Sequence, residues 1–266
     1  MTPDEYCQNK SAQSGSSFYY SFLFLPKERR RAITALYAFC REVDDAVDEP
    51  EEASVAQAKL AWWRNEVAQL YAGRPQHPVT RALEPLVVPF NIDRARLEDI
   101  MDGMEMDLLQ SRHRVASVVG ILAAGIFGYR NPQTLDYAAK LGLAFQLTNI
   151  IRDVGEDARK NRIYLPMDEL KQFEVTAADI LNARQTENFA KLMAFQGERA
   201  QRCYDEALAL LPPEDRRDQR TGLIMAAIYR TLLDEIAADG YQVLRQRTAL
   251  PPLRKLWLAW KTWVST

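Results

Sequence analysis

Few residues of the kinds used in common metal and nucleophile sites occur in this sequence. Only two of its 266 residues are histidines, His77 and His113, so we expect neither a histidine base nor a multi-histidine metal site. The three cysteines, Cys7, Cys40 and Cys203, are scattered and form no CxxC pair. That pattern is typical of free thiols that pack inside a protein from a reducing compartment.

Long apolar runs, a strong net charge and glycine-rich nucleotide motifs are absent as well. The sequence has no run of about 18 apolar residues and no basic-then-apolar leader, so we expect a cytoplasmic protein without a membrane-spanning helix. The formal net charge of -2 and the pI near 5.9 argue against broad nucleic-acid binding. Neither a Rossmann fingerprint nor a P-loop occurs, so no NADPH requirement is expected.

What is present reads as helix along most of the chain. Apolar residues recur at helical spacing, strand-like alternation is scarce, and 47% hydrophobic content is ample for a large core. No linker, repeat or low-complexity tract divides the chain, so we predict an all-α fold in a single domain, residues 1–266. Helices are expected near residues 27–49, 51–72, 93–109, 114–128, 133–158, 186–211, 221–240 and 252–263.

Two short acidic motifs carry most of the functional signal: DDAVD at residues 44–48 and DVGED at residues 153–157. In each, the outer carboxylates stand four residues apart, which on a helix puts them on one face, with Cβ atoms about 5–6 Å apart. Arg41 and Arg152 stand just upstream. Carboxylates that hold Mg²⁺ beside arginines that hold phosphate oxygens can bind a diphosphate and remove it from carbon.

The second motif belongs to a longer polar stripe. Gln146, Asn149, Asp153 and Asp157 follow one another at steps of three, four and four along an otherwise apolar helix. Because an unpartnered buried polar group costs about 1–3 kcal/mol, a continuous stripe predicts a polar lumen. One carboxylate pair alone is more often a buried network or a solvated face, but two pairs with matching arginines favour a site.

The first motif repeats this pattern on an earlier helix. Tyr37, Arg41, Asp44 and Asp48 fall along one helical face. We take Asp44 and Asp48 as cation ligands and Asp45 as a flanking charge, because Asp45 does not fully share that face.

Weaker features surround these motifs. Small hydroxyl residues at 11–17 precede the aromatic run that begins at Phe18, which suits a phosphate-binding turn with an aromatic wall or, equally, a capping segment with core aromatics. Asp107 could add to the metal cluster. The basic cluster at 159–162 either neutralises a diphosphate or ends a helix, and Tyr164 could cover the same pocket.

The C-terminal stretch, residues 244–263, mixes arginine and lysine with leucine and three tryptophans. Such a helix suits docking onto an anionic membrane surface, and a plain terminal core helix is about as consistent with the pattern.

The sequence closely resembles the squalene/phytoene synthase family, the head-to-head isoprenyl diphosphate synthases, over almost its whole length. Within the family, SGSSFYYSFLFLP and GMEMDL are most similar to the presqualene diphosphate synthases of bacterial hopanoid biosynthesis. The matching segments are SFYYSFLFLP (17–26), YAFCREVDDAVDE (37–49), DGMEMD (102–107), QLTNIIRDVGEDARKNRIYLP (146–166) and AAIYRTLL (226–233).

The resemblance implies an isoprenoid-synthase helical bundle around a central apolar cavity. It implies Mg²⁺, or Mn²⁺ in its place, on Asp44, Asp48, Asp153 and Asp157, and we expect these four with Tyr37 and Arg41 to act in catalysis. The residues expected to bind substrate are Ser17, Phe18, Arg41, Gln146, Asn149, Arg152, Arg162, Tyr164, Tyr229 and Arg247.

The resemblance also implies a reaction. One farnesyl diphosphate ionises to an allyl cation, the double bond of a second farnesyl diphosphate attacks it, and proton loss closes a cyclopropane to give presqualene diphosphate. Metals and arginines stabilise the leaving diphosphate, while an apolar cavity shields the cation from water. Synthesis of phytoene, dehydrosqualene, squalene or hydroxysqualene is the alternative within the family, and a helical lipid-binding scaffold is the alternative outside it. Contacts with downstream pathway enzymes and with the inner membrane face stay open.

Two further expectations concern the cavity. The volumes of the side chains at Leu141, Ala144, Phe145, Ile121 and Ala124 could set the length of the prenyl chain. Between Gln110 and His113 the sequence is shorter than is usual in the family, where that segment includes a tyrosine near the cavity. Either the deletion is real or a segment is missing from this sequence. We favour the second, because so abrupt a shortening would strain the cavity wall.

Overall fold

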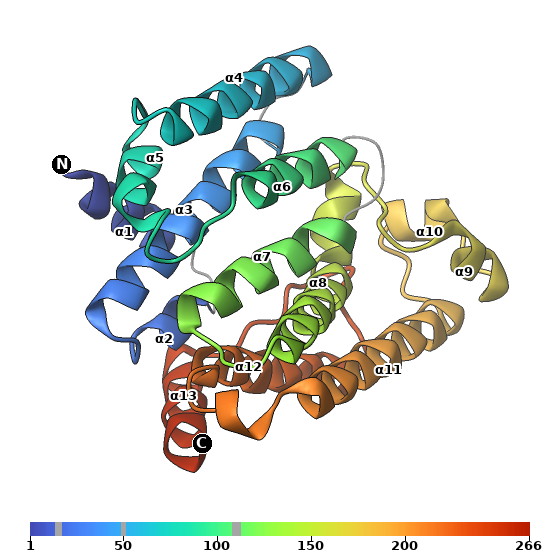
Figure 1. Cartoon of the computed structure of the whole chain (residues 1–266). Coiled ribbons are helices and arrows are strands. Elements are labelled where there is room, and N and C mark those ends of the chain that lie inside the picture. Colours follow the sequence, from blue (N-terminus) through green and yellow to red (C-terminus); the bar gives the residue numbers. More distant parts are fainter. Residues whose placement is uncertain (14–17, 49–51, 108–112) are drawn as a thin grey trace.

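The computed structural model describes residues 1–13, 18–48, 52–107 and 113–266, and these residues form helices and no strand. The all-α prediction is therefore confirmed (Figure 1). The helices are α1 Pro3–Gln13, α2 Phe18–Phe22, α3 Lys27–Asp48, α4 Ala53–Tyr71, α5 Pro78–Leu83, α6 Arg94–Asp107, α7 His113–Phe127, α8 Gln133–Arg159, α9 Met167–Gln172, α10 Ala177–Leu181, α11 Glu187–Leu210, α12 Arg220–Ala238 and α13 Pro252–Ser265, with single 3-10 turns η1 Glu84–Leu86 and η2 Pro213–Asp215.

All eight helices expected from the apolar spacing are present, with ends that differ by only a few residues. The short helices α1, α2, α5, α9 and α10 were not predicted. Except for α1 they have at most six residues, too few for a helical period to be visible. Within the described residues, none of the helices combines the length and the apolar character needed to cross a bilayer.

Two clusters of buried apolar residues lie on either side of the middle of the molecule. The N-terminal cluster is centred on α3, which packs against α1, α4, α5 and α6. The C-terminal cluster is centred on α8, which packs against α11 and α12. Helix α7 contributes Leu122 and Ile126 to the first cluster and Ala124 to the second. The space between the clusters is where the site lies.

The amphipathic pattern of α3 explains how that helix is placed. Ile33, Leu36, Val43 and Val47 recur at helical spacing and all are buried in the N-terminal cluster. Cys40, on the same stripe, is only partly buried and faces the space between the clusters instead. Helix α3 therefore serves both as the spine of one core and as a wall of the site.

Buried polar groups fix the turn between α7 and α8. The Asp215 carboxylate accepts hydrogen bonds from the backbone N–H groups of Arg130 (2.8 Å) and Asn131 (3.0 Å) and from the Thr134 hydroxyl (2.6 Å). Burial alone would raise the pKa of Asp215, but these hydrogen bonds outweigh it and lower that pKa. Gln219 adds bonds from its amide to the carbonyl oxygens of Ala124 (3.2 Å) and Gly128 (2.8 Å). The ends of α7, α8 and α12 are thereby held together.

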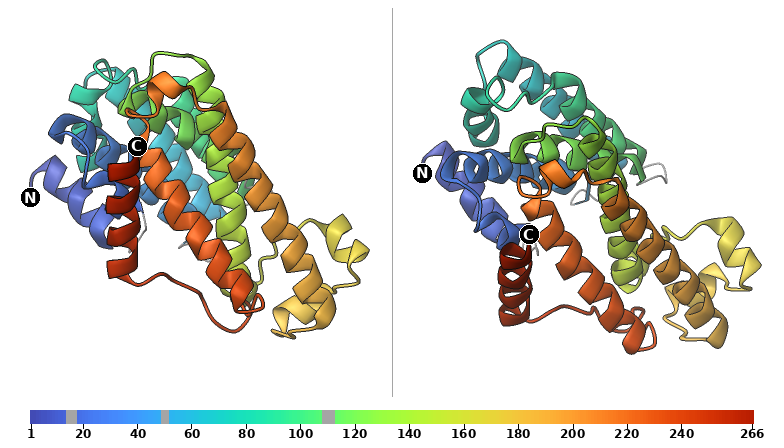
Figure 2. Two further views of the ribbon diagram at one scale, coloured as in Figure 1. Left: turned by 90° about the horizontal axis from the view of Figure 1, so that it is seen from below. Right: turned by 60° about the horizontal axis from the view of Figure 1, so that its bottom comes forward.

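Helix α13 lies beside α12 and reaches its position through the extended segment that follows α12 (Figure 2). Ala259 is buried, but Leu253, Trp257, Trp260 and Val264 are more than half exposed. Helix α13 therefore packs one face on the core, with Leu258 and Trp263 against the C-terminal cluster, and leaves its other face exposed. Helices α9 and α10 project from the end of α8 and α11 (Figures 1 and 2).

Candidate active site

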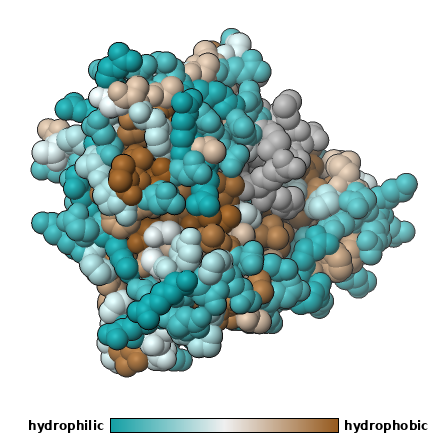
Figure 3. Space-filling model, viewed as in Figure 1, coloured by the Kyte–Doolittle hydropathy of each residue, from teal (hydrophilic) through white to brown (hydrophobic). Residues whose placement is uncertain are grey.

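A cavity of about 390 Å³ opens between the two core clusters, within the size range of small-molecule sites. Its walls come from α2, α3, α7, α8 and α12, from residues 247–250 and from the first turn of α13. Figure 3 shows apolar residues gathered across the middle of the face where α7 lies, with hydrophilic residues above and below. The central apolar cavity implied by the resemblance is present.

One end of this cavity is polar and rich in cations. Its described lining includes Arg41 on α3, Arg152 on α8, Arg247 after α12 and Lys255 on α13, against the single carboxylate of Asp44. Such an excess of guanidinium and ammonium groups in a partly enclosed site favours an anionic ligand, and arginine forks match phosphate oxygens.

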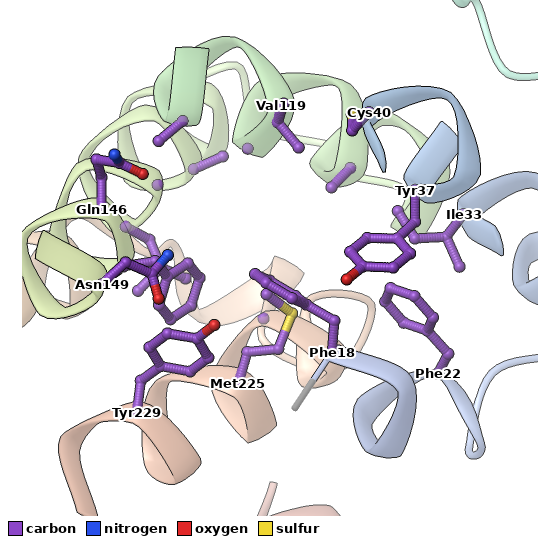
Figure 4. A pocket seen from close by; sticks show the side chains of 18 of the residues that line it. Phe18, Phe22, Ile33, Tyr37, Cys40, Val119, Gln146, Asn149, Met225 and Tyr229 are labelled. Atoms are coloured by element: carbon purple, nitrogen blue, oxygen red, sulfur yellow. The ribbon is translucent and has the colours of Figure 1, made fainter. Parts of the chain in front are cut away.

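The first half of the α8 stripe faces this polar end. Gln146 and Asn149 point into the cavity in Figure 4. The Asn149 carbonyl oxygen Oδ1 is buried and has no hydrogen-bond partner among the described residues. An amide oxygen left in that state is costly unless a donor in the cavity completes it, so this position favours a ligand with a hydrogen-bond donor or a bridging water.

Aromatic rings surround the middle of the cavity. Phe18 lies 5.7 Å from Tyr37 and 5.6 Å from Tyr229, and Phe145 lies 4.9 Å from Tyr229, measured between ring centroids. Figure 4 shows Phe18 between Tyr229 on one side and Tyr37 with Phe22 on the other. Ring faces can stabilise a positive charge, and the same rings keep water away from it.

The first aspartate motif holds its arginine within a single helix. The Arg41 guanidinium donates to Asp44 (2.6 Å) and to Asp45 (2.9 Å), and Lys10 on α1 forms an ion pair with Asp45 (2.9 Å). Burial opposes the charge of Arg41, but these carboxylates outweigh it and raise the pKa of the guanidinium. Asp45 is thus engaged by two cations and does not line the described cavity, and its role as a flanking charge stays a prediction.

The second motif uses a cation from a distant segment. Arg152 donates from Nε to Oδ1 of the adjacent Asp153 (2.7 Å), and Arg247 donates to the same oxygen (3.0 Å) and lies 3.3 Å from Glu156. Burial would raise the pKa of Asp153, but the two guanidinium groups outweigh it and lower that pKa, so the carboxylate is ionised.

A glycine inside the second motif makes this arrangement sterically feasible. A Cβ atom on Gly155 would meet the carbonyl oxygens of Val243 at 2.5 Å and Leu244 at 2.6 Å. Only glycine lets the segment after α12 cross α8 so closely, and Arg247 follows three residues later.

The end of α8 turns a third arginine back toward α3. Asn161 has a positive φ of 56°, and the N–H groups of Asn161 and Arg162 donate to the carbonyl oxygens of Ala158 (3.0 Å) and Asp157 (2.9 Å). This is the Schellman pattern that ends helices. The Arg162 side chain then donates to Asp48 at 2.5 Å. The basic cluster at 159–162 therefore ends a helix and also links the two motifs.

The predicted site residues fall into three groups in the structure. Asp48, Asp153, Asp157, Arg162 and Tyr164 are described but are not part of the cavity lining. Ser17 lies outside the described residues, as do the side chain of Asp107 and the shortened segment around Gln110. The predicted residues that line the cavity are Phe18, Tyr37, Arg41, Asp44, Gln146, Asn149, Arg152, Tyr229 and Arg247.

The expected chain-length residues divide as well. Ala124, Leu141 and Phe145 line the cavity, whereas Ile121 and Ala144 do not. Ala144 instead packs in the C-terminal cluster. On helix α8 the lining residues form an arc from Tyr137 to Gln146, and Ala144 lies just outside the Tyr137 edge of that arc.

Several lining residues were missed. Phe22 follows Phe18 by four residues on α2, a spacing that would have paired them had α2 been predicted. Lys255 was assigned only to the basic C-terminal stretch, and nothing local indicates that it lies at the cavity. Tyr137, at the start of α8, carried no signal beyond its apolar neighbours.

Whether this site suits a divalent cation depends on the oxygen donors that its carboxylates offer. Within residues 1–13, 18–48, 52–107 and 113–266, no three His, Cys, Asp or Glu side chains are grouped closely enough to hold a metal ion. Asp44, Asp48 and Asp153 each form an ion pair with an arginine instead. Their oxygens are nevertheless the hard donors that Mg²⁺ prefers, so the residues present fit such an ion.

Fold and site together define an all-α enzyme that binds apolar chains carrying anionic head groups. The family model for squalene/phytoene synthase matches residues 11–254, and the chain belongs to that family. Membership makes it a prenyltransferase of the class that joins two isoprenyl diphosphates head to head.

Individual relatives support this assignment. A phytoene synthase of Arthrospira platensis is 37% identical, with 95% of this chain and 89% of the relative covered, and a 15-cis-phytoene synthase of Synechococcus elongatus is 34% identical over the same shares. Among solved structures, a dehydrosqualene synthase in complex with ligand has a TM-score of 0.85 at 27% identity, covering 99% of this chain and 96% of its own. Squalene synthase HpnC from Alicyclobacillus acidocaldarius has a TM-score of 0.76 at 27% identity, covering 90% and 94%.

Proposed function

We propose that this protein condenses two molecules of farnesyl diphosphate to presqualene diphosphate, releasing one diphosphate. The observation that carries the proposal is the cavity itself, in which a cation-rich polar end adjoins an aromatic and apolar interior. The polar end suits a diphosphate, and the interior suits the prenyl chain. The proposal uses no NADPH.

The arginines hold and stabilise the departing diphosphate. Arg41, Arg152 and Arg247 line the polar end, and their charges attract the negative charge that grows on the leaving oxygen. Mg²⁺, or Mn²⁺, bound by Asp44, Asp48, Asp153 and Asp157 would add further positive charge to the same leaving group. Asp44 and Asp153 also hold these three arginines in place through ion pairs.

The aromatic belt protects the cation that ionisation leaves behind. Phe18, Tyr37, Phe145 and Tyr229 lie around the middle of the cavity, next to the polar end. Their ring faces stabilise the allyl cation, and their bulk excludes water that would otherwise trap it as an alcohol. The second farnesyl chain would lie along the same apolar wall, so that its double bond reaches the cation.

Phytoene synthesis is the second candidate, favoured by one specific observation. The relatives named above at 37% and 34% identity are both phytoene synthases. That reaction would place geranylgeranyl chains in the same cavity, and chain length therefore separates the two candidates. A lipid-binding scaffold would keep its fold and binding when its aspartates are replaced, and would turn over neither substrate.

Purified protein should be incubated with Mg²⁺ and farnesyl diphosphate, with and without NADPH, and in parallel with geranylgeranyl diphosphate. Mass spectrometry of intact and dephosphorylated products then decides. Accumulation of a presqualene diphosphate regardless of NADPH supports the proposal. Squalene formed only with NADPH would reassign the protein to full squalene synthesis. Turnover of geranylgeranyl diphosphate alone would assign phytoene synthesis. Turnover of neither substrate would favour the lipid-binding scaffold.

We also infer that α13 docks on an anionic membrane surface. Trp257 and Trp260 are more than half exposed, and Lys261 lies 5.1 Å from the Trp257 ring. Exposed tryptophan beside lysine is typical of helices that lie in the headgroup region. Lys255 on the same helix lines the cavity, so docking would bring the cavity close to the membrane that must receive an insoluble product.

Vesicle sedimentation tests this inference. The protein should sediment with phosphatidylglycerol vesicles more than with phosphatidylcholine vesicles, and a Trp257→Ser, Trp260→Ser variant should lose this binding while keeping turnover of dispersed substrate. Trp62→Ser is the matched control, because Trp62 is also about half exposed but lies on α4. Equal binding by all three proteins would contradict the inference.

A further inference from the structure

The end of the cavity opposite the charged residues is blind, since Phe127, Tyr137 and Gln219, which line it there, are at most 3% exposed. Helices α3, α8 and α12 line the cavity in one register, with their N-terminal lining residues at the blind end. These residues are Ile33, Tyr137 and Gly222, and the lining residues further along the same helices are Asp44, Arg152 and Tyr229. Helix α7 runs the other way and brings Phe127 to the blind end. The Asp215 and Gln219 hydrogen bonds described above fix this end of the bundle.

Tyr137 closes the blind end by reaching from one helix to another. It is 1% exposed and lines the cavity, and a Cβ atom on Gly222 of α12 would lie only 2.7 Å from its hydroxyl oxygen. The ring of an α8 residue therefore spans the whole gap to the α12 backbone. A larger residue than glycine at 222 would displace it, so this close approach depends on both residues.

The hydroxyl of Tyr137 has no evident structural purpose. It is buried and has no hydrogen-bond partner among the described residues. A phenylalanine would fill the same volume without burying an unpaired hydroxyl, so the hydroxyl is not what closes the cavity. What the position supplies to the cavity is the volume of the ring.

The helical rise of α8 gives an estimate of the cavity length that is left for a prenyl chain beside this ring. Tyr137 and Asn149 both face the cavity and stand twelve residues apart, which at about 1.5 Å per residue is about 18 Å along the helix. Van der Waals contact with the ring takes about 4 Å of that length, which leaves about 14 Å. An extended chain advances about 1.2 Å per bond, so farnesyl needs about 13 Å and geranylgeranyl about 18 Å.

We propose that Tyr137 is a specificity-determining residue that limits the prenyl chain to farnesyl length by closing the blind end of the cavity. This inference rests on the proposed function, since it concerns the substrate of the same site. Geranylgeranyl would need the space that the Tyr137 ring occupies, and farnesyl would end against the ring.

The test compares kcat/KM for farnesyl and geranylgeranyl diphosphates in Tyr137→Ala, Tyr137→Phe and wild type. Tyr137→Ala opens the blind end of the cavity. It should raise the ratio of kcat/KM for geranylgeranyl diphosphate to kcat/KM for farnesyl diphosphate at least about 10-fold, since removal of a steric block of this size changes discrimination by that order. Tyr137→Phe keeps the ring and should keep the wild-type ratio. Ile151→Ala is the matched control, because Ile151 is equally buried on α8 but does not line the cavity.

Binding measurements keep the test independent of turnover. Calorimetry with the unreactive thiodiphosphate analogues of the two substrates should show the same change in relative affinity, and Tyr137→Leu replaces the alanine variant if the latter does not fold. A ratio in Tyr137→Ala within about twofold of wild type would overturn the inference while leaving farnesyl condensation intact. A wild type that binds the geranylgeranyl analogue as tightly as the farnesyl analogue would overturn it too. Failure of the proposed function would give a different result: the protein would still bind the farnesyl analogue more tightly than the geranylgeranyl analogue, but it would not condense farnesyl diphosphate.

Discussion

The two aspartate motifs look alike in sequence but are held in different ways. In the first, Arg41 bonds Asp44 and Asp45 from the same helix, three and four residues away. In the second, Asp153 receives Arg152 from its own helix and Arg247 from a segment 94 residues further along the chain. The arginine of the first motif is paired within its own helix, whereas the second motif gains its second arginine only after the tertiary structure has formed.

A cross-link makes the two motifs depend on each other. Arg162, just after the second motif, bonds Asp48 at the end of the first, across 114 residues of sequence. The first motif therefore also has distant partners, Arg162 on Asp48 and Lys10 on Asp45. If the comparison is right, damage to the second motif should cost more activity than equivalent damage to flanking charges of the first.

The largest effect is expected from the residue on which two arginines converge. Asp153→Asn removes a charge from the second motif and should lower kcat by about 10³-fold, because stabilisation of the leaving group weakens. Steady-state turnover of farnesyl diphosphate measures this, and circular dichroism checks the fold. Asp136→Asn, an exposed residue on the same helix, should be neutral. Wild-type turnover by Asp153→Asn would remove this residue from the site.

Cutting the distant link should have the next largest effect. Arg247→Ala leaves Asp153 with Arg152 alone and should reduce kcat/KM by about 10–100-fold, mainly through KM, since one charge-assisted contact to the diphosphate is lost. Arg247→Lys should recover part of the loss. Arg245→Ala, two residues earlier, exposed and outside the cavity lining, is the control. Equal losses in the 245 and 247 variants would contradict a specific role for Arg247.

The ion pairs of Asp153 should also make the free energy of unfolding depend on pH in acid. The pKa of Asp153 is lowered in the folded protein, from an ordinary value of 3.8, by its guanidinium partners acting against burial. Its contribution is therefore fully present above pH 3.8 and is lost as the pH falls through the lower folded pKa. Urea unfolding of wild type and Asp153→Asn should show a constant stability difference from neutral pH to about pH 5 that narrows only in stronger acid. A difference that disappears already near neutrality would contradict this assignment.

The smallest effect is expected at the flanking charge. Asp45→Asn breaks partly exposed ion pairs with Arg41 and Lys10, which are worth about 0–1 kcal/mol, and should change kcat less than about threefold. Thermal melting and turnover measure both quantities. Asp44→Asn is the matched comparison one residue earlier. Losses of equal size in the two variants would place Asp45 inside the site.

Sequence reasoning recovered the long helices because burial of one face leaves a periodic pattern. Helix α1 left no such pattern, since only Cys7 and Ser11 are buried on it, and it is held to α3 by ion pairs such as Lys10 with Glu42 (3.0 Å). Helices of five or six residues are fixed by their surroundings and by local caps, as where Thr176 and Asp179 form a capping box at α10.

For the site, the α8 stripe and Arg41 could be predicted from spacing, because the helix itself brings those residues together. Arg247 came only from the family resemblance. The positions of Lys255 and of Tyr137 at the cavity result from the packing of distant helices, so no local pattern could indicate them. As with the two motifs, contacts made within one helix could be predicted from the sequence, and contacts made between distant segments could not.

The glycine within the second motif has a consequence for how the protein folds. The contact of Gly155 with the carbonyls of Val243 and Leu244 closes a long stretch of chain, and forming such a contact early would cost much chain entropy. It can form cheaply only once α8, α11 and α12 have packed. We therefore expect Arg247 to join Asp153 late in folding, so that partly folded or nascent chains would carry both aspartate motifs without an assembled reactive centre.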